Sequence, residues 1–168
     1  METKTTAPAT VITSEVMLNH WQGHRTLTRR TIEAFPEKEL FTFSVGGMRP
    51  FAALAMEIID LSNPGMQGLV HDQWKNMNDL PHASGEGMPK TKEELLALWD
   101  ETTQVINRLW AEFMPERFGE ATVAFGQYPG PVYSMLLYFI DNEIHHRGQG
   151  YVYLRALGME PPFFWERP

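Results

Sequence analysis

The chain has 168 residues, enough for one domain with a sizeable buried core, so a single domain over residues 1–168 is expected. Its 14 Lys and Arg against 21 Asp and Glu give a net charge of −7, which argues against a nucleic-acid partner because a phosphate backbone would be repelled. The chain contains no cysteine, which excludes disulfides and thiolate metal ligands and fits a reducing compartment.

The first residues lack the basic start and apolar core of a signal peptide. No apolar run reaches the roughly 18 residues that a membrane span requires. We therefore expect a cytoplasmic protein with no membrane partner, and we expect residues 1–12 to form a flexible tail.

A first helix is predicted over residues 14–35, where apolar residues recur near the helical period. Ser14 is positioned to cap this helix, and Pro36 should end it. The segment 41–49 contains two adjacent glycines and is predicted to be a turn-rich connection.

A second helix is predicted over residues 50–62, because proline is tolerated in a first helical turn and Asn63-Pro64-Gly65 should break the helix. A shorter helix over residues 66–74 is ambiguous in the sequence. Residues 76–90 are rich in Asn, Gly, Pro and Ser, which predicts a long surface loop.

Thr91 and Glu94 form a capping box that should begin another helix, which Pro115 closes. A loop is expected over residues 125–131, followed by a last long helix over residues 132–157. No segment shows the alternation typical of strands. Four substantial helices predict an all-α four-helix bundle, whose sites are built from inward-facing side chains.

The last helix carries an unusual polar strip, because Asn142, His146, Gln149 and Tyr153 are spaced four, three and four residues apart and so share one face. The same face is apolar further toward the N-terminus of the helix, which indicates that it points inward. Buried polar groups need partners or an ion. For His146, hydrogen bonding and metal ligation both remain open. His145 lies about 100° away around the helix and should not share a metal with it.

Glu57 is the only polar side chain in the segment 51–59 of the second helix. If the bundle brings it against His146, a carboxylate and an imidazole meet, and both are legitimate metal ligands. Two alternatives are that Glu57 faces solvent or forms an ion pair with a buried imidazolium.

The remaining histidines carry weaker signals. His20 and His24 have a spacing that places two imidazoles on one helical face, but we favour a surface position for both because arginines follow closely. His71 and His82 fall in or near predicted loops and are expected to be solvated.

Arg147 has a guanidinium that could clamp a carboxylate, Glu57 or Glu143, in a bidentate pair. Recognition of an anionic ligand is the second interpretation. The chain lacks both a phosphate-binding glycine loop after a strand and a G-x-S-x-G nucleophile turn, and a cysteine nucleophile is excluded.

The C-terminal motif His145-His-Arg-Gly-Gln149, followed by Tyr-Leu-Arg-like residues and Gly-x-x-Pro-Pro, resembles the signature of the DinB/YfiT-like superfamily of metal-binding four-helix bundles. The resemblance implies an up-down-down-up bundle, often a homodimer, that holds nickel or zinc with three histidines. At the matching positions this chain has Glu57, Asn142 and His146. Glutamate is still a good ligand, whereas asparagine offers only a weak carbonyl oxygen.

The resemblance also implies an activity, because related proteins include S-transferases and an isomerase that use a low-molecular-weight thiol. Our first hypothesis is a metal-dependent transferase or hydrolase in which Gln149, Tyr153 or Arg147 contacts the substrate or supports the ligands. The alternative is a non-catalytic bundle that has lost the metal and binds a small ligand. A dimeric scaffold with an interface near Trp99, Trp110 and Tyr151 is compatible with either.

Overall fold

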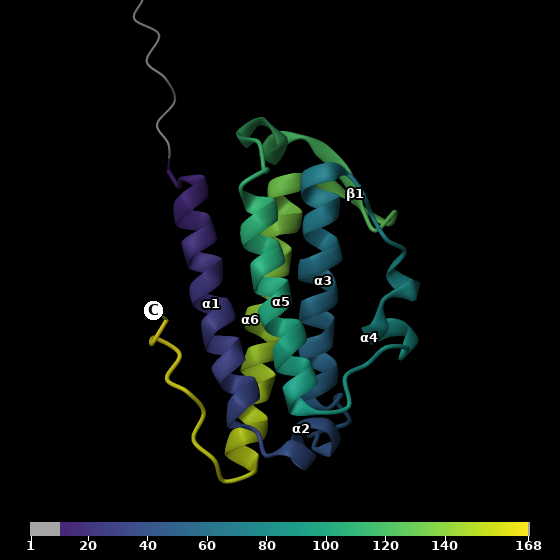
Figure 1. The fold of residues 1–168 in the computed structure, drawn as a ribbon. Helices are drawn as coiled ribbons and strands as arrows, with labels where there is room; N and C mark the ends of the chain where they lie inside the picture. Colours follow the sequence, from purple (N-terminus) through teal and green to yellow (C-terminus); the bar gives the residue numbers. More distant parts are fainter. Residues whose placement is uncertain (1–10, 168) are drawn as a thin grey trace, which may run out of the picture.

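The computed structural model describes residues 11–167, so most of the predicted N-terminal tail lies outside the described residues. Four long helices form the body: α1 (Ser14–Ala34), α3 (Phe51–His71), α5 (Lys92–Trp110) and α6 (Val132–Ala156). Helices α1 and α6 run opposite to α3 and α5 (Figure 1). Both α1 and α3 pack against α5 and α6. The predicted all-α, up-down-down-up four-helix bundle is therefore confirmed.

Shorter elements connect these helices: α2 (Glu37–Thr42), the 3-10 turn η1 (Met77–Asp79), α4 (Pro81–Ser84) and the 3-10 turn η2 (Pro115–Gly119). The long connection from α3 to α5 descends along the outside of the bundle and carries η1 and α4 (Figure 1). It has more regular structure than the surface loop predicted for this region.

A small antiparallel hairpin precedes α6, contrary to the expectation of no strands. Strand β1 (Ala121–Ala124) pairs with β2 (Tyr128–Pro131), with Ala121 opposite Pro131. The turn has positive φ angles at Phe125 (53°) and Gly126 (70°). Each strand has four residues, too few for the alternating pattern to stand out in the sequence.

The predicted break at Asn63-Pro64-Gly65 is wrong, because α3 continues through it to His71. Buried apolar residues lie on both sides of Pro64, and Gly65 lets the Phe139 ring approach so closely that an added Cβ would lie 2.6 Å from it. This packing outweighs the roughly 3 kcal/mol that an interior proline costs a helix. The helix ends instead at Asp72, which has a left-handed φ of 59°.

The predicted helix ends are otherwise close to those observed. The capping box of Thr91 and Glu94 is present at the start of α5, as predicted. Helix α1 is capped by Thr13, whose Oγ1 accepts a hydrogen bond from the Val16 N–H at 3.2 Å, and not by Ser14. Helix α5 ends at Trp110, before it reaches Pro115.

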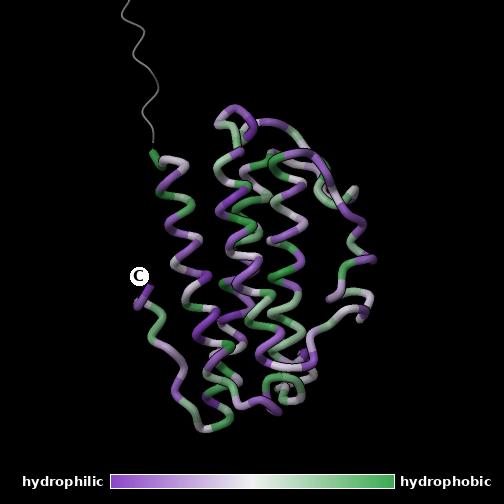
Figure 2. Tube along the Cα trace, viewed as in Figure 1, coloured by the Kyte–Doolittle hydropathy of each residue, from purple (hydrophilic) through white to green (hydrophobic). Residues whose placement is uncertain are grey.

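The core consists of two apolar clusters separated by a polar layer. One cluster surrounds Trp21 and Phe139, and the other surrounds Phe51 and Trp99. Buried polar residues occupy the middle of the bundle, and hydrophilic and hydrophobic segments alternate along the long helices (Figure 2). Because each helix contributes to this layer, it can bring groups from distant parts of the sequence together.

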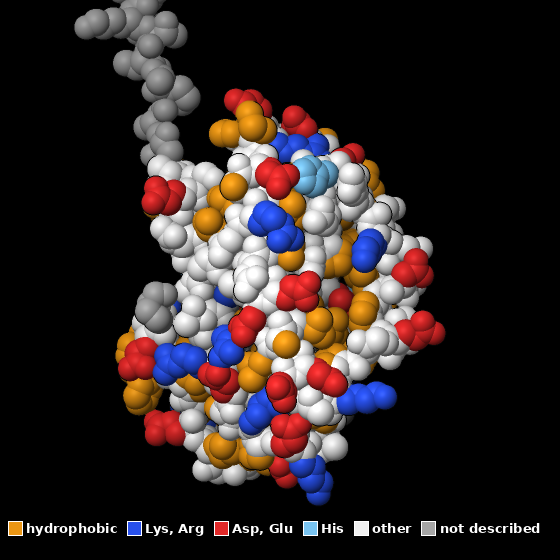
Figure 3. Space-filling view, in the orientation of Figure 1, with side chains coloured by type: hydrophobic (Ala, Val, Ile, Leu, Met, Phe, Trp, Pro, Cys, Tyr) orange, Lys and Arg blue, Asp and Glu red, His pale blue; other side chains and the backbone are white. Residues whose placement is uncertain are grey.

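Two tryptophans expected at a dimer interface are buried within the chain itself, since Trp99 and Trp110 are only 1% and 7% exposed. They cannot supply an interface without disrupting the core. The face drawn in Figure 3 intersperses acidic and basic side chains. None of the helices in residues 11–167 is long and apolar enough to cross a membrane.

Candidate functional site

Glu57 lies at the centre of a polar cluster between α3 and α6. Its Oε1 accepts hydrogen bonds from Asn142 Nδ2 and His146 Nε2, each at 3.0 Å. Asn142 and His146 lie one turn apart on α6, and their residues are 8% and 6% exposed. The structure therefore brings together the three residues that the sequence selected.

Arg49 completes the cluster from the turn before α3, where its guanidinium pairs with Glu57 Oε2. The Tyr153 hydroxyl donates to the Arg49 carbonyl at 3.0 Å and so fixes this turn against α6. Burial alone would raise the pKa of the Glu57 carboxyl, but hydrogen bonds from His146, Arg49 and Asn142 hold that pKa well below its ordinary value. Arg49 was not among the predicted site residues, because it precedes the helix and shares no periodicity with Glu57.

His146 has acceptors at both ring nitrogens. Its Nδ1 lies 2.8 Å from Gln149 Oε1, while Nε2 faces the Glu57 carboxylate. Both ring nitrogens therefore face acceptor oxygens. Glu57 lies between the Arg49 guanidinium and the His146 imidazole, and Gln149 orients the ring instead of reaching a separate site.

This arrangement does not fit a resident divalent cation. The described residues contain no group of three or more His, Asp or Glu side chains that could hold a metal ion. Asn142 turns its N–H₂ group toward Glu57, and the opposite amide orientation would set two oxygens against each other. A divalent ion would also have to enter beside the Arg49 charge. The predicted ligand set therefore forms an ion-pair cluster.

A cavity of about 430 Å³ adjoins the Glu57 side chain. It lies between α3, α6, the hairpin and the connection that carries α4. Most of its surface is apolar, and its wall includes three residues that carry hydroxyl groups, Ser134, Tyr128 and Tyr138. Burial and the negative charge of Glu57 raise the pKa of the Tyr138 hydroxyl, which therefore remains a hydrogen-bond donor at neutral pH. The remaining wall residues are Leu61, Met77, His82, Ala124, Phe125, Met135 and Phe139.

His82 is not solvated as predicted, because it pairs with a buried carboxylate at the wall of this cavity. Asp60 Oδ2 lies 2.8 Å from His82 Nδ1 and also accepts the His82 backbone N–H at 2.8 Å. The side chains of His82 and Asp60 are 10% and 5% exposed. Asp60 follows Glu57 by three residues, so α3 presents both carboxylates on one side.

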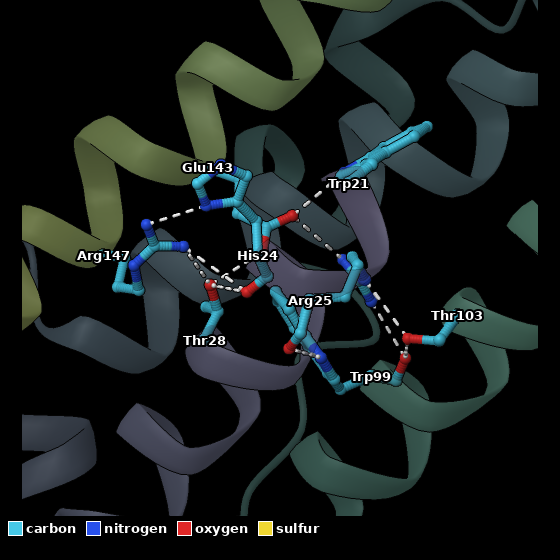
Figure 4. Close-up of polar contacts among 8 residues, drawn as sticks. All are labelled: Trp21, His24, Arg25, Thr28, Trp99, Thr103, Glu143 and Arg147. Carbon is cyan, nitrogen blue, oxygen red and sulfur yellow. Dashed lines mark hydrogen bonds and ion pairs between the residues drawn. The ribbon is translucent and has the colours of Figure 1, made fainter. Parts of the chain in front are cut away.

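A second polar network lies between α1, α5 and α6 (Figure 4). Glu143 is fully buried and accepts hydrogen bonds from Trp21 Nε1 at 3.1 Å and Thr28 Oγ1 at 2.7 Å. Arg25 lies 3.8 Å from the same carboxylate, and its guanidinium stacks 3.6 Å from the centre of the Trp99 ring.

Arg147 belongs to this second network and not to the Glu57 cluster. It donates to Thr28 Oγ1 at 3.1 Å, and its Nη2 lies 3.0 Å from His24 Nδ1. The expected bidentate clamp on Glu57 or Glu143 is absent, although the charge of Glu143 still favours the guanidinium. Arg147 therefore joins α6 to α1 on the far side of α6 from the cavity.

The predicted surface position is wrong for His24, which is 4% exposed, and right for His20, which is exposed. Burial, the charge of Arg147 and then those of His20 and Arg167 lower the pKa of His24 to about 3, so it is a neutral acceptor. His71 is partly exposed and lies 3.2 Å from Glu112.

The DinB family model matches residues 1–167. No curated protein matches the chain. Among solved structures, a DinB-like protein from Bacillus cereus is 17% identical, with a TM-score of 0.70, and the alignment covers 89% of this chain and 95% of that one. A DinB-like protein from Bacillus subtilis is also 17% identical, with a TM-score of 0.68 and coverage of 88% and 96%.

A third similar structure is a mycothiol-dependent maleylpyruvate isomerase. It is 15% identical, with a TM-score of 0.63, and the alignment covers 83% of this chain and 61% of the isomerase. At identities of 15–17%, these three comparisons show that the chain shares the fold of these proteins.

Proposed function

The chain belongs to the DinB family, and from that premise and the cavity beside Glu57 we propose that it binds and acts on a small organic molecule in this cavity, without a resident divalent ion. One observation carries the proposal: a largely apolar cavity of about 430 Å³ opens directly onto the half-buried carboxylate of Glu57 and its polar cluster. Small-molecule sites commonly combine an apolar surface with a few convergent polar groups.

The wall residues indicate the chemistry of the ligand. Phe125 and Phe139 suit an apolar or aromatic body, while the hydroxyl of Tyr138 and the carboxylate of Glu57 suit a polar end. Because Glu57 is a carboxylate, it accepts hydrogen bonds, which favours a ligand with an O–H, N–H or S–H group there.

A low-molecular-weight thiol is one such ligand. The isomerase that shares this fold depends on mycothiol, which supports a thiol as the class of ligand. We propose a thiol transferase or hydrolase activity on this basis. The metal-dependent form of that activity, which the family resemblance implies, is not part of this proposal, because Glu57 is already paired with the Arg49 guanidinium and hydrogen-bonded to His146.

Binding can be tested by thermal unfolding and by amide chemical shifts of ¹⁵N-labelled protein titrated with glutathione, cysteine and small phenols. Saturable shifts confined to residues of the cavity wall are expected. Ser134→Phe, which adds a ring to the wall, should abolish them. Val152→Phe adds the same ring to the exposed face of the same helix and should not.

If no probe causes saturable shifts at the wall, the cavity is not a ligand site. If phenols bind and thiols do not, the site is retained and the thiol assignment is lost.

A further inference from the structure

We infer that Asp60 and His82 form a general-base pair that takes a proton from an O–H or S–H group of the molecule bound in the cavity. The inference rests on the proposed function, because it needs a ligand in that cavity. It assigns a chemical role to a pair outside the Glu57 cluster.

The geometry of the pair fixes the tautomer of His82. Its Nδ1 lies 2.8 Å from Asp60 Oδ2, and a carboxylate can only accept, so Nδ1 carries a proton. In the neutral form of the ring, the lone pair is therefore on Nε2. Among the described residues, Nε2 has no hydrogen-bond partner, while the His82 side chain forms part of the cavity wall.

Asp60 is suited to orienting this base. It is 4% exposed, and its Oδ2 also holds the backbone of His82 at 2.8 Å. The imidazole is thus fixed at both its ring and its main chain. A buried carboxylate at this position stabilises the imidazolium that forms when Nε2 takes a proton, as in other carboxylate–histidine pairs.

The other titratable groups at the cavity are poorer bases. Glu57 accepts three hydrogen bonds that stabilise its charged form, and burial and the charge of Glu57 raise the pKa of the Tyr138 hydroxyl, so this group stays protonated near neutral pH. Tyr128 is the other phenol of the wall. These groups and Asp60 are the titratable side chains that face His82 from α3, α6 and the hairpin. His82 is therefore the group best able to remove a proton.

The proposed step is a single proton transfer. The O–H or S–H bond of the ligand breaks, and its electron pair stays on oxygen or sulfur. The proton forms a new N–H bond at His82 Nε2, and the resulting positive charge lies beside Asp60. The ligand gains a nucleophilic oxygen or sulfur in a largely apolar cavity, where the anion is poorly solvated and reactive.

We would test this with 4-nitrophenol, because its phenol and phenolate forms absorb at different wavelengths. Binding is measured by ¹⁵N shifts of the cavity wall, and the protonation of the bound probe is measured by absorbance between pH 5 and 8. In the wild-type protein, the phenolate-to-phenol ratio of the bound probe should exceed that of free probe at the same pH.

Two variants separate the pair from its surroundings. His82→Gln should lower the bound phenolate-to-phenol ratio by about tenfold or more, equivalent to one pKa unit, while the probe still binds. Asp60→Asn should also lower the bound phenolate-to-phenol ratio. His71→Gln changes a histidine outside the cavity wall and should leave the ratio unchanged.

The possible failures are distinct. If neither 4-nitrophenol nor any of the thiols and phenols used above binds in the cavity, the proposed function and this inference are both contradicted. If one of those thiols or phenols binds and 4-nitrophenol does not, the proposed function is retained and the inference of a base acting on phenols is contradicted. If it binds equally to wild type and His82→Gln with the same ratio, the cavity remains a ligand site and His82 is not its base. Circular dichroism of both variants checks that the fold is retained, and ¹⁵N spectra of His82 in wild type should show the Nδ1–H tautomer independently of any probe.

Discussion

The Trp21 indole donates a hydrogen bond to the Glu143 carboxylate in the interior of the bundle, where Glu143 has no exposed surface. This contact joins α1 to α6 across the polar layer. Because Arg25 and Arg147 are also buried nearby, Glu143 supplies the negative charge that offsets them. Two polar groupings therefore share the layer, one structural and one open to the cavity.

Replacing Glu143 should destabilise the bundle strongly. Glu143→Gln keeps the size of the side chain but leaves buried arginine charge without a counterion, for which a loss of about 3–5 kcal/mol is expected. Urea unfolding measures the free energy. Glu101→Gln removes an exposed carboxylate of α5 and should change it by less than about 0.5 kcal/mol. Equal effects of the two substitutions would contradict the structural role of Glu143.

His24 should make stability fall in mild acid. Burial first, and then Arg147 and other nearby cationic groups, lower its pKa in the folded protein from 6.5 to about 3. Since the unfolded chain binds the proton more readily, the contribution of neutral His24 is complete above pH 6.5 and is lost progressively as the pH falls toward 3. Through His24 alone, the free energy of unfolding falls by at most about 1.4 kcal/mol for each pH unit.

The pH effect can be isolated by comparing wild type with His24→Gln, whose amide oxygen can still accept from Arg147. The variant should show a shallower decline in unfolding free energy between pH 6.5 and pH 5. This window lies above the range in which an ordinary carboxyl group titrates. Parallel declines in the two proteins would show that His24 does not contribute, and His71→Gln serves as the control for removing a histidine.

The sequence predicted the bundle well because its helices carry local signals, such as the Thr91 and Glu94 capping box. The prediction was wrong where tertiary packing overrides local sequence preference. Pro64 lies within a helix because buried residues on both sides keep the backbone helical, and Gly65 admits the Phe139 ring. No local pattern reports such a contact between α3 and α6.

The same distinction applies to the candidate site. Asn142 and His146 were found because they share a helical face, and Glu57 because it is the only polar residue in its segment. His82 was missed because its partner Asp60 is 22 residues away and lies on another element. Periodicity identifies groups on one helix, but it does not reveal which loop covers them.

Two nearby glycines of α6 should respond oppositely to alanine. At Gly150 an added Cβ would lie 2.4 Å from Phe51 Cε2, so Gly150→Ala must displace a buried ring, at a cost of about 1–3 kcal/mol. At Gly148 nothing lies within 4 Å, and the better helix propensity of alanine should stabilise by up to about 1 kcal/mol. Thermal and urea unfolding of the two variants test this pair, and a neutral result at Gly150 would refute the close helix contact.

Metal binding should depend on restoring the ligands that this chain lacks. Protein purified without a metal column should contain no stoichiometric nickel or zinc, and a chelator should not change its unfolding temperature, because Glu57 is already paired with Arg49 and His146.

The double substitution Glu57→His, Asn142→His supplies the three histidines that the family resemblance implies. With nickel or zinc at about 100 times the dissociation constant, the double variant should gain about 2.7 kcal/mol, or roughly 5–10 °C. Asn142→His alone serves as the intermediate control. One equivalent of metal in the wild-type protein, lost with His146→Ala, would instead establish the metal site and overturn the ion-pair interpretation of the cluster.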